Sequence, residues 1–269
     1  MKVVLKIYRL LTAIYKDRRL LTSLAWQDFK RRFAGSYFGV LWGFINPLLT
    51  ITVYWLVFQF GFRSGAVDDH PFVLWFMCGI VAWLFFSEAF SSASNSFLEY
   101  SYLVKKVVFN VNILPLVKIF SCLFVHLFFI GLLVILCCLF GYYPTVYWLQ
   151  LPYYVLCSMS LLFALSLVFA SVIVFFRDLN QIINIILLIG MWGTPIAWNL
   201  NTFPENTHLF FKLNPVFYIV EGYRDCFLQE IWFWQKYNHT AYFWLLTAVL
   251  LLVGAFVYDR LKQSFADFL

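Results

Sequence analysis

The sequence predicts an all-α integral membrane protein with six transmembrane helices, an interfacial helix before the first of them, and a helical hairpin between the fifth and sixth. Of the 269 residues, 63% are hydrophobic and only 12% are charged, which leaves too little polar surface to cover a water-soluble globule. Long uncharged stretches recur along the chain, and most basic residues lie beside alternate ends of these stretches. We therefore expect a single membrane domain over residues 1–269.

The spans are predicted from length and charge. A helix of about 20 apolar residues crosses the hydrocarbon core of a bilayer. Pro195 lies near the end of the fifth stretch, where we expect it to kink the helix. The six uncharged stretches are 38–60, 71–87, 119–140, 151–176, 182–198 and 241–258.

The basic residues predict the orientation. Only Arg63, Lys212, Arg224 and Lys236, of the 19 Lys and Arg residues, fall on the side of the membrane opposite to the others. Because cytoplasmic loops carry the excess of basic residues, both termini are predicted to be cytoplasmic. The turns that contain Asp68, Tyr143 and Glu205 are then external, and Lys105 and Arg260 face the cytoplasm.

Residues 1–36 form a cytoplasmic or interfacial segment in this scheme. Within it, residues 19–34 carry apolar side chains near one helical face, which is typical of a helix lying on the membrane surface. The alternative is a plain basic flank that only fixes topology. The apolar face consists of Leu21, Leu24, Ala25 and Phe29.

The external segment 199–240 is too apolar for a free loop. Residues 205–213 and 216–229 are each predicted to be helical, with a break at Asn214 and Pro215, because proline disfavours helical geometry in the preceding residue. Neither helix is long enough to span, so we expect a re-entrant or surface-lying hairpin. Glu221 and Arg224 lie three residues apart, where opposite charges on a helix can meet, with solvated surface charges as the alternative.

Three polar residues fall in or beside the predicted spans. His126 is interpreted as a packing residue that hydrogen-bonds a neighbouring helix, because it is alone and neutral. Glu88 and Lys118 enter the membrane from the same side and could pair, or each could reach a separate partner. Glycines also recur at every fourth position, which predicts a stripe for close helix contact: Gly35, Gly39 and Gly43.

Several kinds of chemistry are excluded by the motifs. The sequence has no G-x-x-x-x-G-K-[ST] phosphate loop, no H-E-x-x-H signature and no paired-cysteine ligand set. We therefore predict that the chain is not an enzyme, and that it has no catalytic residue, metal site or bound cofactor of its own. The basic residues lie beside membrane spans, so nucleic acid is not an expected partner.

Two stretches resemble a known family, the ABC-2 type permeases that export bacterial surface polysaccharides. The first begins with residues 28–33 and continues through Ser36, Gly39, Leu41, Trp42, Asn46 and Pro47; the second contains Asn214, Pro215, Glu221, Arg224 and Asp225. The order of spans and the long segment before the last span agree as well, so the likeness covers nearly the whole chain.

The resemblance implies the membrane subunit of an exporter for O-antigen, capsular polysaccharide or teichoic acid in the bacterial cytoplasmic (inner) membrane. In such exporters two permease copies work with two copies of a separate ATPase subunit, which binds ATP and magnesium, and the substrate is a lipid-linked polysaccharide. The coupling segment of the family maps to residues 95–112, where an ordinary basic loop is the alternative. Its predicted contacts with the ATPase are Glu99, Tyr100, Lys105 and Lys106.

Aromatic residues suggest a path for the glycan, since sugar rings present apolar C–H faces that stack on aromatic rings. For each residue the alternative is an aromatic side chain facing lipid or the membrane interface. The predicted path residues are Trp55, Phe58, Trp192 and Trp198. The predicted external gate comprises Pro195, Asn214, Pro215, Glu221 and Arg224.

Two other functions remain open at this point. One is an ABC-2 permease that exports a drug or a small lipid, because the same fold can serve several substrates. The other, from a different class, is a membrane-embedded transferase acting on lipid-linked sugars. A transferase is expected to carry clusters of acidic residues or histidines at a membrane interface, and the sequence contains none.

Overall fold

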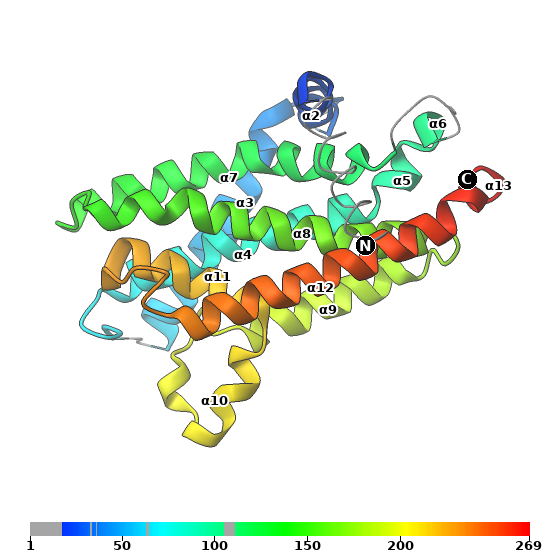
Figure 1. Ribbon diagram of the computed structural model, residues 1–269. Coiled ribbons are helices and arrows are strands. Elements are labelled where there is room, and N and C mark those ends of the chain that lie inside the picture. The colour runs from blue at the N-terminus through cyan, green and yellow to red at the C-terminus, as the bar shows by residue number, and fades with distance from the viewer. Residues whose placement is uncertain (1–17, 33, 36, 63–64, 105–110) are drawn as a thin grey trace.

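The computed structural model describes residues 18–32, 34–35, 37–62, 65–104 and 111–269 as helices joined by short connections (Figure 1). In this part of the chain the only β pairing is an isolated bridge between Val67 and His70. Five helices are long and apolar enough to cross a membrane: Gly39–Gly61, Phe72–Ser94, Ile113–Leu139, Val146–Ile173 and Tyr237–Ser264. The predicted all-helical membrane class is confirmed.

Each long helix is named by its main α-helical part. The first is α3 (Trp42–Leu56) between two short helical turns, η1 (Gly39–Leu41) and η2 (Val57–Gly61). The second and third are α4 (Phe72–Ser94) and α7 (Ile113–Leu139). The fourth is α8 (Leu151–Ile173) preceded by η3 (Val146–Gln150), and the last is α12 (Tyr237–Leu261) followed by η6 (Lys262–Ser264) and α13 (Phe265–Phe268).

The fifth predicted span is shorter than expected. It corresponds to α9 (Leu179–Gly193), whose 15 residues reach about 22 Å, against a hydrocarbon core of about 30 Å. Thr194 has extended backbone angles, φ −110° and ψ 131°, because the following Pro195 disfavours helical geometry in the residue before it. Pro195 therefore ends the helix, and the prediction that it kinks a helix running on to Trp198 is wrong.

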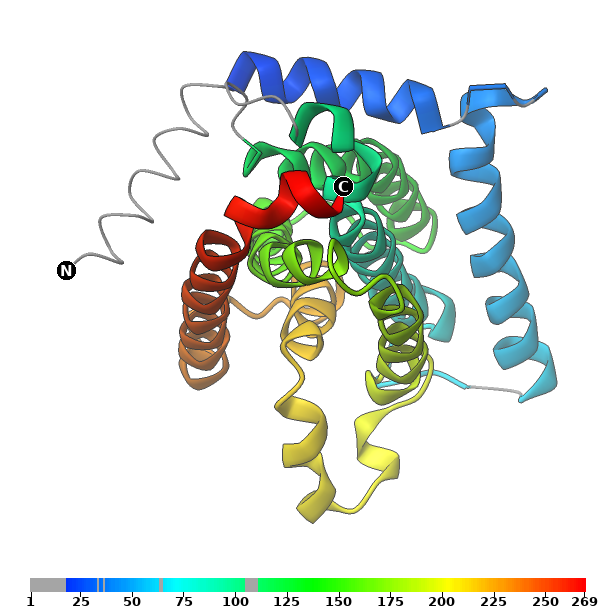
Figure 2. The ribbon, with the colours of Figure 1, turned by 90° about the vertical axis from the view of Figure 1, so that its right-hand side faces the viewer.

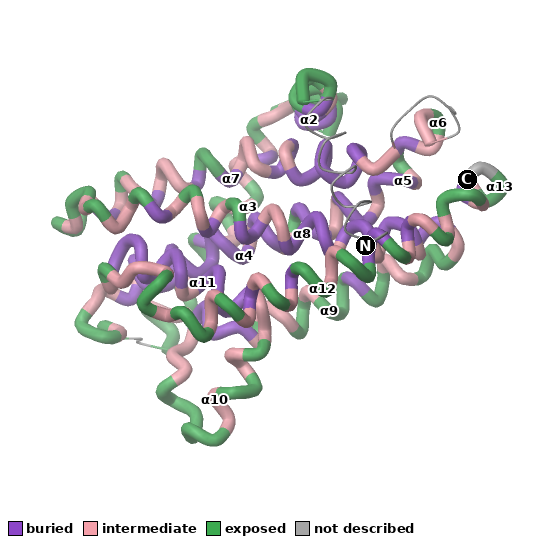
Figure 3. Tube along the Cα trace, viewed as in Figure 1, coloured by how far each residue is buried: buried purple, intermediate pink, exposed green. Residues whose placement is uncertain are grey.

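The centre of the bundle is α4. It packs against α7, α8, α9 and α11 (Pro215–Arg224), and most of its side chains are buried, as expected for a helix that is apolar on every side. Figure 3 shows the buried residues concentrated in α4, in α11 and in the parts of α7 and α8 that face them. Gly254 brings α12 against α8, because a Cβ there would lie 2.9 Å from the Ala164 carbonyl oxygen.

The first span stands to one side of the bundle. In Figure 2, α2 (Arg18–Arg32) lies across one end of the spans and leads to α3, which is separated from the other spans over most of its length. Only Gly43 and Ile51 of α3 are buried. Gly35 and Gly39 have positive φ, +89° and +50°, and lie before α3 begins. The predicted glycine stripe on one helix is therefore wrong, and these two glycines permit turns instead.

The amphipathic helix is confirmed as a helix with a buried face. The buried residues of α2 are Leu21, Ala25, Asp28 and Phe29, which include three of the four predicted apolar positions. The helix packs on α7 close to the end of the bundle that also carries α5 (Ser96–Glu99) and α6 (Ser101–Val104). We call this the α2 end.

The opposite end, which we call the hairpin end, carries most of residues 199–240. A short turn, η4 (Leu200–Thr202), precedes α10 (Glu205–Lys212), and α11 continues into η5 (Asp225–Gln229). The predicted break at Asn214 and Pro215 is confirmed: the Asn214 side chain accepts a hydrogen bond from the Val216 amide at 3.0 Å, and Pro215 occupies the first helical position. Figure 1 shows α10 projecting from the bundle while α11 lies within it.

Gly222 offers a test of the packing of α11. A Cβ at this position would lie only 2.0 Å from the Tyr154 ring of α8, so Gly222→Ala must displace one helix from the other. We expect a loss of stability of about 1–3 kcal/mol or more, measured as a lower midpoint of thermal unfolding in detergent. Gly131→Ala on α7 is the matched control, since nothing lies within 4 Å of its Cβ position. Equal unfolding midpoints for the two variants would contradict this packing.

Candidate functional site

A buried arginine, Arg224, links α11 to α4 and to the chain after α9 at the hairpin end. Arg224 leaves only 1% of its side chain exposed, and a buried guanidinium is tolerated only when its donors and its charge are matched. It donates to the Glu221 carboxylate at 2.6 Å, which confirms the predicted approach of these two charges. The solvated alternative is thereby excluded for Arg224.

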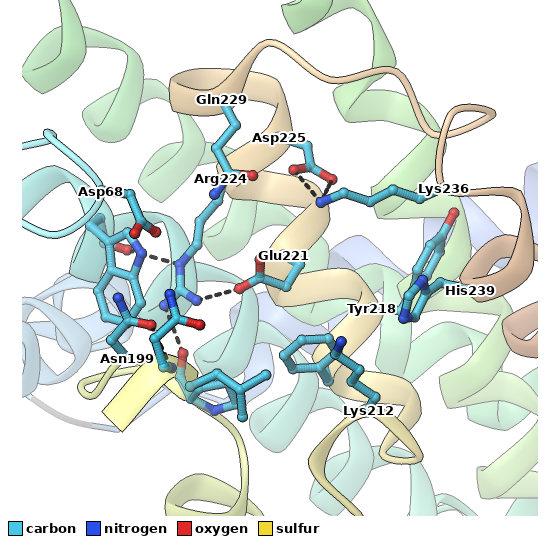
Figure 4. Close-up of a pocket in the computed structure, with 15 residues that line it drawn as sticks. Asp68, Asn199, Lys212, Tyr218, Glu221, Arg224, Asp225, Gln229, Lys236 and His239 are labelled. Carbon is cyan, nitrogen blue, oxygen red and sulfur yellow. Dashed lines mark hydrogen bonds and ion pairs between the residues drawn. The ribbon is translucent and has the colours of Figure 1, made fainter. Parts of the chain in front are cut away.

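The other donors of Arg224 reach two segments that are remote in sequence. One terminal nitrogen donates to the carbonyl oxygens of Pro195 and Ile196, at 2.8 and 3.2 Å, and Nε lies 3.4 Å from the Trp75 carbonyl oxygen. The guanidinium carbon also lies 3.4 Å from the centre of the Trp75 ring, a cation–π arrangement (Figure 4). We call Trp75, Pro195, Ile196, Glu221 and Arg224 the Arg224 cluster.

The end of α9 explains why acceptors are available for Arg224. Pro195 prevents the helix from continuing, so the carbonyl groups of Pro195 and Ile196, which follow α9, take no part in a helical hydrogen-bond ladder and accept from Arg224 instead. The chain that leaves α9 is held a second time by Asn214, whose amide donates to the Thr194 hydroxyl at 2.8 Å. The predicted gate residues Pro195, Asn214, Glu221 and Arg224 are thus brought together, and Pro215 begins the helix that carries the last two.

A polar cavity of about 230 Å³ lies beside Arg224 (Figure 4). The turn at residue 68, the chain after α9, helices α10 and α11 with η5, and the start of α12 contribute to its wall. Its charged residues, including those that lie in the Arg224 cluster, are Asp68, Lys212, Glu221, Arg224, Asp225 and Lys236.

The predicted glycan-path residues form two separate groups. Trp192 is half-exposed at the end of α9, and its carbonyl oxygen accepts a hydrogen bond from the Trp198 indole at 3.2 Å. Trp55 and Phe58 lie on the first span, at ring distances of 5.9 Å from Phe60 and 6.1 Å from Phe72. Within the described residues no ring contact joins the two groups.

A second polar cluster lies at the α2 end. Asp28 of α2, 6% exposed, accepts hydrogen bonds from the Lys118 ammonium at 2.7 Å and from the Tyr100 hydroxyl at 2.6 Å. Lys118 also pairs with Glu99. We call Asp28, Glu99, Tyr100 and Lys118 the Lys118 cluster.

These contacts decide between the alternatives for Glu88 and Lys118. Glu88 pairs with Arg32 of α2, and Lys118 pairs with Asp28 and Glu99, so the two do not form a pair with each other. Of the predicted coupling residues, Tyr100 points into the subunit and Glu99 remains half-exposed. Lys105 and Lys106 lie outside the described residues.

His126 behaves as the sequence predicts. Its ring stacks on Phe85 at a centroid distance of 4.3 Å, and Nε2 lies 2.7 Å from the Tyr223 hydroxyl of α11. The packing interpretation is confirmed. The partner lies next to Arg224 in sequence, so α7 is hydrogen-bonded to the helix that carries the Arg224 cluster.

Two features of the hairpin end were not predicted. Asp225 is buried and accepts two hydrogen bonds from Lys236 at 2.7 Å each, which ties η5 to the start of α12. Trp75 lies in an apolar run of α4, and nothing in that run signals that its ring and carbonyl face an arginine far along the chain. The pair of Asp225 and Lys236 could have been predicted from the sequence, because both are charged residues in a largely apolar segment.

A model of the ABC-2 type transporter family matches residues 19–228, which include every residue of both clusters. The chain belongs to the ABC-2 type transporter family. The match begins in α2 and ends in η5, so the hairpin end is part of the family domain.

Curated members of this family are similar along their whole length. The chain is 28% identical over 264 residues to the O-antigen export system permease protein RfbA of Myxococcus xanthus, covering 96% of this chain and 98% of that one. It is 25% identical over 251 residues to a protein of the same name from Klebsiella pneumoniae, covering 93% and 95%.

The Asp225 carboxyl predicts a pH dependence of stability. Burial raises its pKa to about 6, against the opposing effect of Lys236, whereas in the unfolded chain an aspartate titrates near 3.9. Between these values the folded protein keeps a proton that the unfolded chain has released. The free energy of unfolding therefore falls as pH rises from about 4 to about 6, by about 2–3 kcal/mol from this group.

Asp225→Asn removes this titration. As pH rises from 4 to 6.5, the thermal unfolding midpoint of the natural protein should fall relative to that of the variant. Comparing the two proteins removes the effect of the other carboxyl groups, which both proteins share. Parallel profiles would show that Asp225 does not titrate in this range.

Proposed function

We propose that the chain is the membrane-spanning permease subunit of an ABC exporter that moves a lipid-linked or otherwise anchored polysaccharide across the bacterial cytoplasmic membrane. The observation that carries the proposal is the full-length similarity to two permeases named for O-antigen export. The sequence has no phosphate loop, so a separate ATPase subunit would supply the energy, binding ATP and magnesium. The proposed substrate is a polysaccharide of the O-antigen, capsule or teichoic-acid type.

A homodimer is part of this proposal. Side chains fill the interior of the described bundle, and the cavities beside Arg224, beside Pro47 and beside Lys118 have volumes of only about 230, 360 and 400 Å³. A polymer therefore needs a path between subunits. Exposed apolar side chains on α3 and α9 offer surface for a second copy. Of the predicted path residues, Trp192 is exposed on α9 and Trp198 follows α9, whereas Trp55 on α3 and Phe58 on η2 are partly buried.

The orientation follows from the basic residues. We infer that α9 and the residues after it complete a sixth crossing, that both termini are cytoplasmic, and that the hairpin end is external. On this view α2 lies at the cytoplasmic surface. Labelling of a cysteine placed at Arg260 by an impermeant reagent added to intact cells would contradict this orientation.

The coupling segment 95–112 is proposed to contact the ATPase through Glu99, Lys105 and Lys106. Tyr100 would act from inside the subunit, because its hydroxyl is bound to Asp28. A displacement of this segment by the ATPase would be transmitted to α2 through Asp28 and to α7 through Lys118. The Lys118 cluster thereby supplies a physical connection between the ATPase contact and two helices of the permease.

The function is tested by deleting the protein from the strain that carries it. We expect the surface glycan to disappear and lipid-linked glycan to accumulate inside the cell, and the natural chain supplied from a plasmid to restore export. An unchanged surface glycan would rule out this substrate class, and loss of resistance to a drug instead would favour a small-molecule exporter.

The Arg224 cluster gives the sharpest variant test of the gate. Arg224→Met removes the charge and leaves Glu221 and two carbonyl groups without their donor, a change that costs about 3–5 kcal/mol at a buried pair. We expect export to fall at least tenfold, measured as surface glycan per copy of inserted protein. Arg177→Met removes the charge of an exposed arginine that does not line the cavity and has no ion pair among the described residues, and it is the matched control.

The structure also predicts that exchanging the two charges fails to restore export. In the variant Glu221→Arg with Arg224→Glu, the new carboxylate faces the carbonyl oxygens of Pro195 and Ile196, which repel it. Rescue by the exchange would mean that only the pair of charges matters. It would overturn the role assigned to the two carbonyl groups.

A further inference from the structure

The cavity beside Arg224 contains more polar groups than the fold uses. The Asn201 and Gln229 amides, the Lys212 ammonium, the His239 ring and the Asp68 carboxylate line it, and among the described residues none of these side chains has a hydrogen-bonding partner of its own. Glu221 uses one carboxylate oxygen for Arg224, and the second has no partner in the same set. The cavity thus offers free donors and free acceptors.

The charges of the cavity select against several ligand classes. Three carboxylates (Asp68, Glu221 and Asp225) are balanced by three cations (Lys212, Arg224 and Lys236). A phosphate group would meet the three carboxylates. A divalent cation would meet the three cations, and two of the carboxylates, Glu221 and Asp225, are already paired with Arg224 and Lys236. An apolar ligand would leave the charged groups desolvated without partners. A neutral ligand rich in hydroxyl groups avoids each of these costs, because every hydroxyl both donates and accepts.

The size of the cavity restricts the ligand further. Its volume of about 230 Å³ lies below the range of roughly 300–1,000 Å³ typical of pockets for drug-sized molecules. One sugar unit fits this limit and a long oligosaccharide does not. The aromatic rings of Trp75, Phe217 and Tyr218 also line the cavity. The Arg224 guanidinium covers the face of the Trp75 ring, which leaves Phe217 and Tyr218 to contact the apolar face of a sugar ring.

We propose that this cavity binds a saccharide unit of the exported glycan within each subunit, at the hairpin end. The proposal rests on the export function proposed above and assigns it a binding site beside the Arg224 cluster. Asn201 and His239 contribute hydrogen bonds from two segments that are remote in sequence, one after α9 and the other on α12. A bound sugar therefore bridges the chain after α9 and the start of the last span.

The test uses the purified permease assembled with its ATPase in lipid nanodiscs. The probe is the repeating oligosaccharide released by mild acid from the surface glycan of the same strain, and binding is followed by saturation-transfer NMR and calorimetry. We expect the natural protein to bind it, with affinity roughly three- to tenfold weaker in Asn201→Ala and in His239→Ala, the effect of one hydrogen bond each. Asn206→Ala on α10, which does not line the cavity, is the control and should bind as the natural protein does.

Inorganic phosphate is added as a competitor and should not displace the oligosaccharide. Absence of binding to the natural protein, equal binding by all variants, or displacement by phosphate would each overturn the proposal. These outcomes are separate from the export test. If deletion abolishes surface glycan while the cavity binds no saccharide, the export function stands and only the binding site is lost; if deletion leaves the surface glycan unchanged, the export function itself fails.

Discussion

The burial of Arg224 is the constraint on which the hairpin end depends. A guanidinium removed from water must find an acceptor for its donors and a balance for its charge, and the fold supplies both from three places. Glu221 provides the charge from the same helix, Trp75 provides a ring and a carbonyl from α4, and the chain after α9 provides two further carbonyls. Moving α11 away from either neighbour would leave that charge without part of its environment.

The two polar clusters are joined by the same helix. Lys118 and His126 are eight residues apart on α7, a rise of about 12 Å, and they reach the Lys118 cluster and the Tyr223 hydroxyl respectively. Tyr223 is adjacent to Arg224. A displacement of α7 along its own axis would therefore be felt at both the α2 end and the hairpin end, through contacts that are hydrogen bonds rather than adjustable apolar packing.

Sequence patterns predict the parts of this fold that depend on local preferences. The amphipathic face of α2, the break at Asn214 and Pro215, and the Glu221–Arg224 spacing all follow from rules that relate residues close together in sequence. Charge-free length also located all five long helices, although it placed the end of α4 seven residues too early and the start of α7 six residues too late. These features need no knowledge of what lies opposite them in space.

The features that escaped prediction depend on partners remote in sequence or on a single backbone angle. Trp75 and Arg224 are 149 residues apart, and Lys118 and Asp28 are 90 apart, so no helical periodicity connects them. The positive φ of Gly39 converted an expected helix stripe into a turn, and the extended Thr194 ended α9 where charge-free length suggested a longer span. Hydropathy reports which segments avoid water, and it does not report where a helix stops.

Hydrogen–deuterium exchange of the assembled transporter with Arg224→Lys tests the central claim most directly. Lysine keeps the positive charge but lacks the planar set of five donors, so it cannot serve Glu221, the two carbonyls and Trp75 together. The account predicts faster exchange in residues 194–201 and in α11, with α12 and the far part of α7 unchanged. Exchange as slow as in the natural protein throughout residues 194–201 would contradict the claim that Arg224 holds the end of α9 to the hairpin.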